Sequence, residues 1–287
     1  MRMRRFTLIL FAVMLAAFSP ASACTIFGAS KDGAVLVGNN EDHDDPSAMM
    51  WVEPASQGVY GNVTFGFADG YPQGGMNDQG LFYDFFAAGE FRTCPILEGQ
   101  VLPSGETAAT APDWQALVSM YARYGMPAKS MLQTCATVEE AIAFFQTHYE
   151  GVMGYAFIFV ADKSGASCTI TWNWEKGDLA VNRKAGDFQV IGTGSKAVFD
   201  AMNGTGFAAT PDFFRDLLKD TAVDITAYSN IYDLKTGSVT VYRGGDFDEA
   251  YRFLLPEELV KGRREYRLSD FFQTDPPYHS AHHDQPF

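Results

Sequence analysis

Cys24 is the residue with the clearest chemical potential, because it directly follows the small residues Ala21, Ser22 and Ala23. Cleavage after Ala23 makes Cys24 the first residue of the mature chain, with a thiol nucleophile and a free α-amine on one residue. The amine has a pKa of about 7.7–8 and the thiol about 8.5, so the amine is a suitable base near neutral pH. It can take the thiol proton through a bridging water and later return it to a leaving amine. The pattern therefore predicts an N-terminal nucleophile that cleavage activates.

The first 23 residues have the three parts of a secretory signal peptide. Arg2, Arg4 and Arg5 precede an apolar run over residues 6–18, and an Ala-x-Ala cleavage site follows. We therefore expect residues 1–23 to be removed during export and the mature protein to be periplasmic or secreted.

Two other roles for Cys24 stay open on the sequence. A small residue precedes it, as in a lipoprotein, although Ala21 stands where a lipobox favours leucine. A lipoprotein usually continues with a flexible polar tether, whereas a strand-like segment begins here at once. Cys24 can also be half of a disulfide, because export leads to an oxidising compartment.

The remaining cysteines, Cys94, Cys135 and Cys168, show neither a C-x-x-C motif nor the spacing of a metal site. They allow at most one internal disulfide if Cys24 is reserved for chemistry, and we expect Cys94 to pair with Cys135. No metal or cofactor is predicted, since the histidines near the C-terminus belong to a tail over residues 273–287 that we expect to be flexible.

The composition is that of a globular protein, with 47% apolar and 20% charged residues among 287. The formal net charge is −14, and it becomes about −17 without the three arginines of residues 1–23. An acidic surface repels nucleic acid and anionic lipid headgroups. Beyond the N-terminal run, no segment approaches the ~20 apolar residues that span a bilayer. We expect no nucleic-acid partner and no stable membrane association, while a homo-oligomer is compatible with the sequence.

The elements that position Cys24 are mostly strands. We expect a strand over residues 24–30 and another over 34–38, because Asp32-Gly33 between two apolar runs is a hairpin signal. Polar residues 39–46 follow, at a strand end where site residues often lie. Short strands are expected over 48–91, a loop over 92–110, helices over 112–124, 137–145 and 210–220, and further strands over 155–161, 167–174, 179–181, 188–191, 231–234 and 239–242. This order predicts an α+β fold with one domain over residues 24–272.

Three stretches of the chain resemble one known family in their order and spacing. Residues 38–42 read Gly-Asn-Asn-Glu-Asp, and Gly38 comes fourteen residues after Cys24. Residues 75–81 read Gly-Met-Asn-Asp-Gln-Gly-Leu, and residues 245–253 are similar to a C-terminal strand region. Together they resemble the choloylglycine hydrolase / penicillin V acylase family and the related acyl-CoA:6-aminopenicillanic acid acyltransferase-like branch. The resemblance implies the four-layer αββα sandwich of N-terminal nucleophile hydrolases.

The resemblance also implies roles for individual residues. Cys24 matches the nucleophile, and Asp42 matches the aspartate that holds the α-amine, since a nearby carboxylate stabilises the protonated amine. Asn39 stands where the hydrolases have an arginine, so thiol activation or substrate orientation must differ here. Asn40 matches the family pattern and is assigned to substrate binding or to stabilising the turn.

The family's oxyanion hole uses an asparagine side chain and a backbone N–H. The matching segment, residues 190–195, has no asparagine, so we expect Thr193 or Asn173 to supply the side-chain donor. The backbone donor and substrate contacts are expected around Phe86 and Ala87. Arg252 matches a family arginine near the site.

The resemblance therefore implies an exported amidase that hydrolyses a linear, non-peptide C–N bond of an acylated small molecule through a Cys24 thioester. The many aromatic residues at positions 51–91 favour an apolar acyl group. The alternatives are an acyltransferase with the same acyl-enzyme, and a secreted or lipidated binding protein that keeps the fold without turnover.

Overall fold

The computed structural model describes residues 24–45 and 47–273, so the expected signal peptide and nearly all of the expected tail lie outside the described residues. A six-stranded sheet has the order β10 (Phe188–Gly192), β1 (Thr25–Lys31), β2 (Ala34–Asp42), β11 (Thr226–Asp233), β12 (Ser238–Arg243) and β13 (Asp246–Leu254). An eight-stranded sheet has the order β14 (Arg264–Arg267), β3 (Ala48–Glu53), β4 (Asn62–Phe67), β5 (Pro72–Asn77), β6 (Leu81–Ala87), β7 (Ala156–Asp162), β8 (Ser167–Asn173) and β9 (Asp178–Arg183). Neighbouring strands are antiparallel throughout both sheets.

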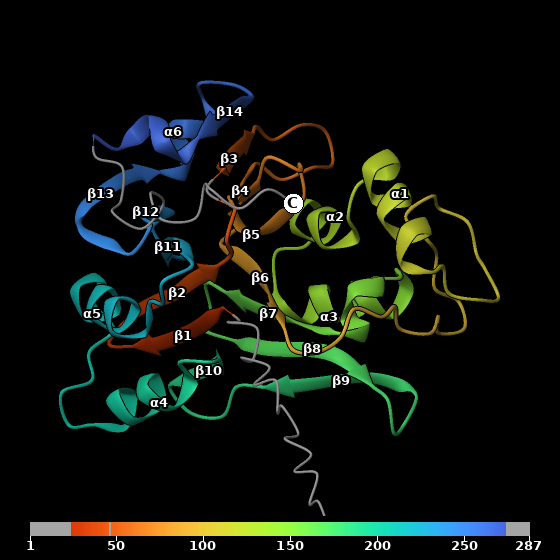
Figure 1. Ribbon diagram of the computed structural model, residues 1–287, viewed down its shortest axis with the longest axis horizontal. Coiled ribbons are helices and arrows are strands. Elements are labelled where there is room, and N and C mark those ends of the chain that lie inside the picture. Colours follow the sequence, from red (N-terminus) through yellow and green to blue (C-terminus); the bar gives the residue numbers. More distant parts are fainter. Residues whose placement is uncertain (1–23, 46, 274–287) are drawn as a thin grey trace, which may run out of the picture.

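Helices cover the outer face of each sheet (Figure 1). The helices α1 (Trp114–Tyr124), α2 (Pro127–Thr134) and α3 (Val138–Thr147) lie on the eight-stranded sheet, and α4 (Ser195–Asn203) and α5 (Pro211–Thr221) lie on the six-stranded sheet. A short helix, α6 (Leu255–Leu259), follows β13. The layers are therefore α, β, β and α, and the expected α+β sandwich is confirmed.

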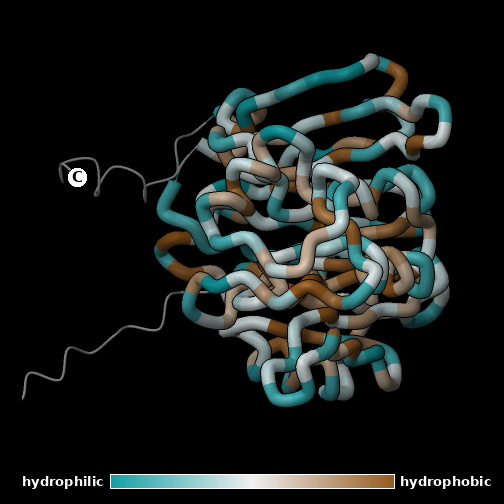
Figure 2. The backbone as a smooth tube through the Cα atoms, turned by 90° about the vertical axis from the view of Figure 1, so that its right-hand side faces the viewer, coloured by the Kyte–Doolittle hydropathy of each residue, from teal (hydrophilic) through white to brown (hydrophobic). Residues whose placement is uncertain are grey.

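Alternation along the strands separates the apolar layers, because successive side chains point to opposite faces. In β1, Ile26 faces the space between the sheets, whereas Phe27 faces α5 and lies 5.0 Å from the ring of Phe214. The layer between the sheets includes Ile26, Val37, Phe65, Phe82 and Phe159. Figure 2 shows the result along the chain: apolar segments gather in the middle of the molecule and hydrophilic segments in its outer loops.

The expected local signals form as elements. The β1–β2 hairpin turns at Asp32 (φ 51°) and Gly33 (φ 86°), the left-handed pair that a two-residue hairpin requires. Thr137 and Glu140 form the expected capping box of α3, and the Thr210 side chain caps α5. The helices α2, α4 and α6 were not expected, and none of them has a side-chain cap that would mark its start.

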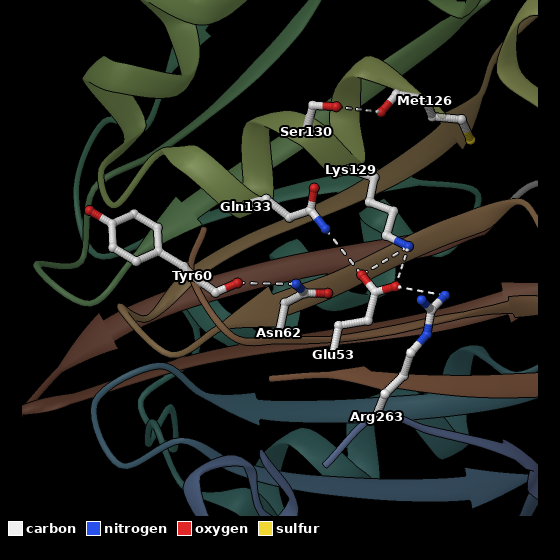
Figure 3. A network of polar contacts seen from close by, with 8 residues as sticks. All are labelled: Glu53, Tyr60, Asn62, Met126, Lys129, Ser130, Gln133 and Arg263. Carbon is white, nitrogen blue, oxygen red and sulfur yellow. Dashed lines mark hydrogen bonds and ion pairs between the residues drawn. The ribbon is translucent and has the colours of Figure 1, made fainter. Parts of the chain in front are cut away.

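The helix α2 is held to the eight-stranded sheet by a polar network around Glu53 of β3 (Figure 3). The Glu53 carboxylate accepts hydrogen bonds from Lys129 Nζ at 3.0 Å and Gln133 Nε2 at 3.1 Å, both from α2. Arg263, which precedes β14, lies 3.4 Å from the same carboxylate. This network joins three separate segments of the chain on one side of the sheet.

The predicted disulfide between Cys94 and Cys135 is wrong, because all four cysteines in the described chain are free thiols. Cys94 is held by the segment after α3, where its thiol contacts the Glu150 carbonyl at 3.4 Å. Cys135 ends α2 beside Thr134. Different segments thus hold the two thiols, and burial raises the pKa of each.

No helix in the described ranges is both long enough and apolar enough to cross a bilayer.

The Asn77 side chain joins the β5–β6 turn to α2, and this role can be tested. Its Nδ2 donates to the carbonyls of Leu132 (2.6 Å) and Cys135 (2.8 Å), and its Oδ1 accepts from the amides of Gln79 (3.1 Å) and Leu81 (2.9 Å). Asn77→Ala should lower the free energy of unfolding by about 2–4 kcal/mol, since it leaves buried backbone groups unsatisfied. Urea denaturation measures this. Gln79→Ala in the same turn is the control, and an equal loss in both variants would contradict the role of Asn77.

Glu150 makes stability depend on pH. Burial raises its pKa from 4.5 to about 7, although Tyr121 and the Ala128 amide donate hydrogen bonds to it. The folded state thus holds the Glu150 proton more tightly than the unfolded chain, and this stabilisation is full below pH 4.5 and disappears as pH rises through about 7. Denaturation at several pH values should show a fall of about 3 kcal/mol from this group. Glu150→Gln should remove that part of the slope, whereas the exposed Glu257→Gln should keep it; parallel slopes in all three proteins would refute the assignment.

Candidate active site

Cys24 lies at the start of β1, next to the centre of the six-stranded sheet, and is 7% exposed. Thr25 pairs with Asn40 of β2, so Cys24 stands opposite Glu41. Ile26, two residues further, belongs to the layer between the sheets, so the Cys24 thiol faces the same interior space. The nucleophile predicted from the sequence is therefore an interior side chain at the end of a strand.

Glu41 and its neighbours continue a row across the inner face of this sheet. Tyr228 of β11 pairs with Glu41, and Arg243 of β12 pairs with Tyr228. A second row holds Asn39 opposite Asn230 of β11. Adjacent strands are about 4.8 Å apart, so Glu41 is the nearest of these groups to Cys24. The two side chains accordingly influence each other's pKa.

Asp84 reaches the same space from β6 of the opposite sheet. It is 1% exposed, and its Oδ1 accepts a hydrogen bond from the Phe85 amide at 2.8 Å. Gly74 of β5 makes room for it, because a Cβ at Gly74 would lie 2.6 Å from the Asp84 carboxyl carbon. Side chains from both sheets thus enclose the Cys24 thiol.

Burial dominates the electrostatics of this space. It raises the pKa of the Cys24 thiol well above its ordinary value, and the charge of Glu41 raises it further. Burial likewise raises the pKa of Glu41, to about 8, and that of Asp84, which the Glu41 charge raises again. None of the groups that shift the Cys24 pKa is a cation.

Asp42, the predicted partner of the Cys24 amine, lies beside Cys24 at the end of β2. Its backbone N–H donates a hydrogen bond to the thiol, which lowers the thiol pKa against the larger effect of burial. Its Oδ1 accepts from the Thr226 hydroxyl at 2.6 Å, while burial raises its pKa to about 6.

Four buried oxygen atoms in this region have no hydrogen-bond donor: Asn39 Oδ1, Glu41 Oε2, Asp42 Oδ2 and Asn230 Oδ1. Buried acceptors without partners are costly, so a group rich in donors fits this space. A free α-ammonium at Cys24 would bring three N–H donors to it. These four acceptors therefore suit the amine of a processed N-terminus.

Thr193 follows β10, which pairs with β1 on its other side, so it lies close to Cys24 in the fold. Gly192 (φ 126°) approaches the Cys24 carbonyl oxygen so closely that a Cβ would lie 2.2 Å from it. The Gly194 amide donates to Thr25 Oγ1 at 3.0 Å. Thr193 itself is exposed, and its role as the side-chain oxyanion donor stays a prediction.

Asn173, the alternative oxyanion donor, is held in a turn by its Oδ1 atom. It ends β8, and its Oδ1 accepts from the amides of Glu175 (3.0 Å) and Lys176 (3.1 Å) in the following turn. The structure therefore does not direct it toward Cys24.

Asn40 does not reach the site. It points to the outer face of the sheet, where its Nδ2 donates to the Leu218 carbonyl (2.9 Å) and the Thr221 hydroxyl (3.0 Å) of α5. Its Oδ1 accepts from the Ser229 hydroxyl at 2.7 Å. Because adjacent residues on a strand face opposite ways, Asn40 anchors α5 and is not a substrate ligand.

Arg252 is also remote from Cys24. It is an exposed residue of β13, at the edge of the six-stranded sheet. Four strand spacings separate β13 from β1, which is roughly 19 Å across the sheet. The structure does not bring this predicted arginine to the nucleophile.

Phe86 and Ala87 end β6, two and three residues beyond Asp84. The Phe86 ring packs 6.2 Å from Phe157, and Ala87 is exposed. A cavity of about 370 Å³ begins at Ala88 and is lined by Ala88, Gly89, Glu90, Arg92, Gly154, Tyr155, Phe157, Thr171, Trp172 and Trp174. The Phe86–Ala87 segment thus leads along β6 from Asp84 to a cavity whose lining combines four aromatic side chains with Glu90 and Arg92.

Sequence reasoning missed Glu41, Asp84, Tyr228 and Asn230. The alternation of β2 was the available signal for Glu41, because it has the same parity as Val35, Val37 and Asn39. The others come from distant segments and carry no motif. In the part of the chain that the structure describes, no three His, Cys, Asp or Glu side chains converge on a common metal position.

Comparison with known proteins supports the fold. No protein-family model matches the sequence, and no curated protein sequence matches it. The fold is similar to that of penicillin V acylase from Agrobacterium tumefaciens, with a TM-score of 0.53, 17% identity, and coverage of 77% of this chain and 83% of that one.

Two further structures show the same similarity. A variant of conjugated bile acid hydrolase from Clostridium perfringens has a TM-score of 0.61 and 13% identity, covering 88% of this chain and 99% of that one. The N-acylethanolamine-hydrolyzing acid amidase ortholog from Caenorhabditis elegans has a TM-score of 0.51 and 14% identity, covering 74% and 93%. The resemblance found in the sequence is thus confirmed as a shared fold.

Gly192→Ala tests the contact between β10 and Cys24. The new Cβ would collide with the Cys24 carbonyl, so we expect a loss of about 2–4 kcal/mol in unfolding free energy beyond the cost of the backbone conformation. Gly186→Ala is the matched control, because Gly186 (φ 87°) also has a positive φ but nothing within 4 Å of an added Cβ. Denaturation of both variants measures the difference. Equal losses would show that the contact does not constrain Cys24.

Proposed function

We propose that the protein is an amidase that uses Cys24, as the N-terminal residue of the mature chain, to hydrolyse a linear C–N bond of an acylated small molecule. The observation that carries the proposal is the Cys24 thiol at the start of β1, beside Asp42 and facing the space between the sheets. The solved structures with this fold include amide hydrolases, which supports the same class of reaction here.

The chemistry follows from a thiol placed beside bases. The thiol proton passes to a base of the site, and the sulfur attacks the acyl carbonyl carbon to form a C–S bond. The C–N bond then breaks, and the amine leaves with a proton from the site. Water attacks the thioester, releases the carboxylic acid and restores the thiol. No step requires a cofactor.

Asp42 and the unpartnered oxygens support the proposed processing step. Removal of residues 1–23 would give Cys24 an α-amine, which can serve as a base near neutral pH. The Asp42 carboxylate and the buried acceptors around it would accept hydrogen bonds from that amine and orient it beside the thiol. We accordingly propose export to the periplasm or the exterior, with cleavage as the activating event.

The aromatic cavity beyond Ala87 supports an apolar acyl group as part of the substrate. Tyr155, Phe157, Trp172 and Trp174 line it, and aromatic faces contribute large apolar contact areas. The proposed partner is thus a small acyl amide. Nucleic acid and a stably bound membrane are not proposed, in keeping with the acidic net charge of −14.

The mature protein should begin at Cys24, and its thiol should be essential. N-terminal sequencing and intact mass test the first point; a lipid adduct or another start would contradict it. With a panel of acyl amides, Cys24→Ala should abolish hydrolysis, and Cys24→Ser should reduce it at least 10³-fold, because the thioester cannot form. Mass spectrometry of the wild type after substrate addition should detect one acyl group on the N-terminal peptide. Full activity in both variants would overturn the proposal.

A further inference from the structure

We propose that Glu41 is a proton acceptor of the nucleophile, and that its carboxylate takes the proton of the Cys24 thiol directly. This inference rests on the proposed role of Cys24 as the nucleophile. It adds a residue that the family resemblance did not assign, because that resemblance gave the activating roles to the α-amine and Asp42.

The geometry singles out Glu41 among the carboxylates near Cys24. Its Cα stands opposite Cys24 on the adjacent strand, and both side chains point between the sheets. Among the carboxylates, Glu41 has the largest effect on the pKa of the thiol, whereas Asp42 acts on the sulfur mainly through its backbone N–H. The second Glu41 oxygen, Oε2, is buried without a partner, so no side chain among the described residues holds the carboxylate away from the thiol.

Charge conservation explains why this chain needs such an acceptor. Asn39 replaces the arginine expected from the resemblance, and no cationic side chain is among the groups that shift the pKa of the thiol. Loss of the thiol proton to solvent would add a negative charge to a space that already contains Glu41, Asp42 and Asp84. Transfer of the proton to ionised Glu41 leaves the net charge unchanged, and it therefore avoids the desolvation cost of an additional buried ion.

Several titratable groups face Glu41 and determine its protonation. They are Cys24 on β1, Asp42 on β2, Asp84 on β6, and Tyr228 and Tyr232 on β11. The buried Arg243 of β12 stands in the same row, one strand beyond Tyr228. Burial raises the pKa of Asp84 well above its ordinary value, and the Glu41 charge raises it further. Ionisation of one carboxylate disfavours ionisation of the other, so the pair holds a proton while one member is charged. Tyr228 and Tyr232 stay neutral because burial raises both of their pKa values.

The proton transfer balances over the cycle. The S–H bond of Cys24 breaks and an O–H bond forms on Glu41, giving a thiolate and a carboxylic acid. After the thiolate attacks the acyl carbon, the Glu41 proton goes to the leaving nitrogen as the C–N bond breaks. During deacylation Glu41 accepts a proton from the attacking water, and this proton returns to the sulfur when the acid leaves.

Alkylation by iodoacetamide tests this role without any substrate, because the reagent reports the thiolate of Cys24. The mature wild type is treated from pH 5 to pH 10, and the modified N-terminal peptide is quantified by mass spectrometry. Burial raises the pKa of Glu41 to about 8, so the rate should rise as Glu41 loses its proton near that pH. Glu41→Gln should slow alkylation at pH 8 at least tenfold and move the rise to higher pH.

Two further variants make the result decisive. Glu150→Gln neutralises another buried glutamate, remote from Cys24, and should keep the wild-type pH profile. Glu41→Asp keeps the charge but withdraws the carboxylate from the thiol by one methylene, so it should also slow alkylation. If Glu41→Gln does not fold, Glu41→Asp is used to test the proposal instead. A wild-type rate and pH profile in a folded Glu41 variant would overturn the proposal. The proposed amidase function fails separately, if Cys24→Ala retains hydrolysis.

Discussion

The antiparallel pairing of β1 with β2 is the constraint on which the candidate site depends. It places Cys24, the residue before Thr25, opposite Glu41, and both side chains point into the space between the sheets. A shift of one residue in this register would place Cys24 and Glu41 on opposite faces of the sheet. The hairpin at Asp32-Gly33 and the apolar alternation of both strands maintain the register, so the same interactions hold the core and aim the thiol.

The sandwich also creates an unusual electrostatic environment for that thiol. Glu41, Asp42 and Asp84 come together where the surrounding layer is apolar, and burial raises the pKa of each. Such groups are normally paired with cations, because an isolated buried charge is costly. Around Cys24 the pairing is with protons, hydroxyl groups and backbone amides instead. This arrangement favours chemistry in which protons move within the site while its total charge stays constant.

The helical layers serve the site indirectly. Asn40 ties α5 to β2 and β11, and Asn77 ties α2 to the β5–β6 turn. Gly74 has no side chain, which leaves room for the Asp84 carboxyl. Gly192 likewise allows the backbone to approach the Cys24 carbonyl. The motif of residues 38–42 therefore divides its residues: Glu41 and Asp42 lie beside the thiol, and Asn40 next to them holds the layers together.

Local chemistry alone determined a large part of this protein. The Asp-Gly turn, the capping box at Thr137 and Glu140, and the proline and threonine that begin α5 act within a few residues, so they could be predicted from the sequence. The αββα order and the position of Cys24 beside Asp42 followed from motif order. Tertiary structure alone decided that Asp84 meets Glu41, that Asn40 faces away, that Arg252 is four strands distant and that Cys94 and Cys135 stay apart. These outcomes depend on strand register and on contacts between segments far apart in the chain, and no local pattern carries that information.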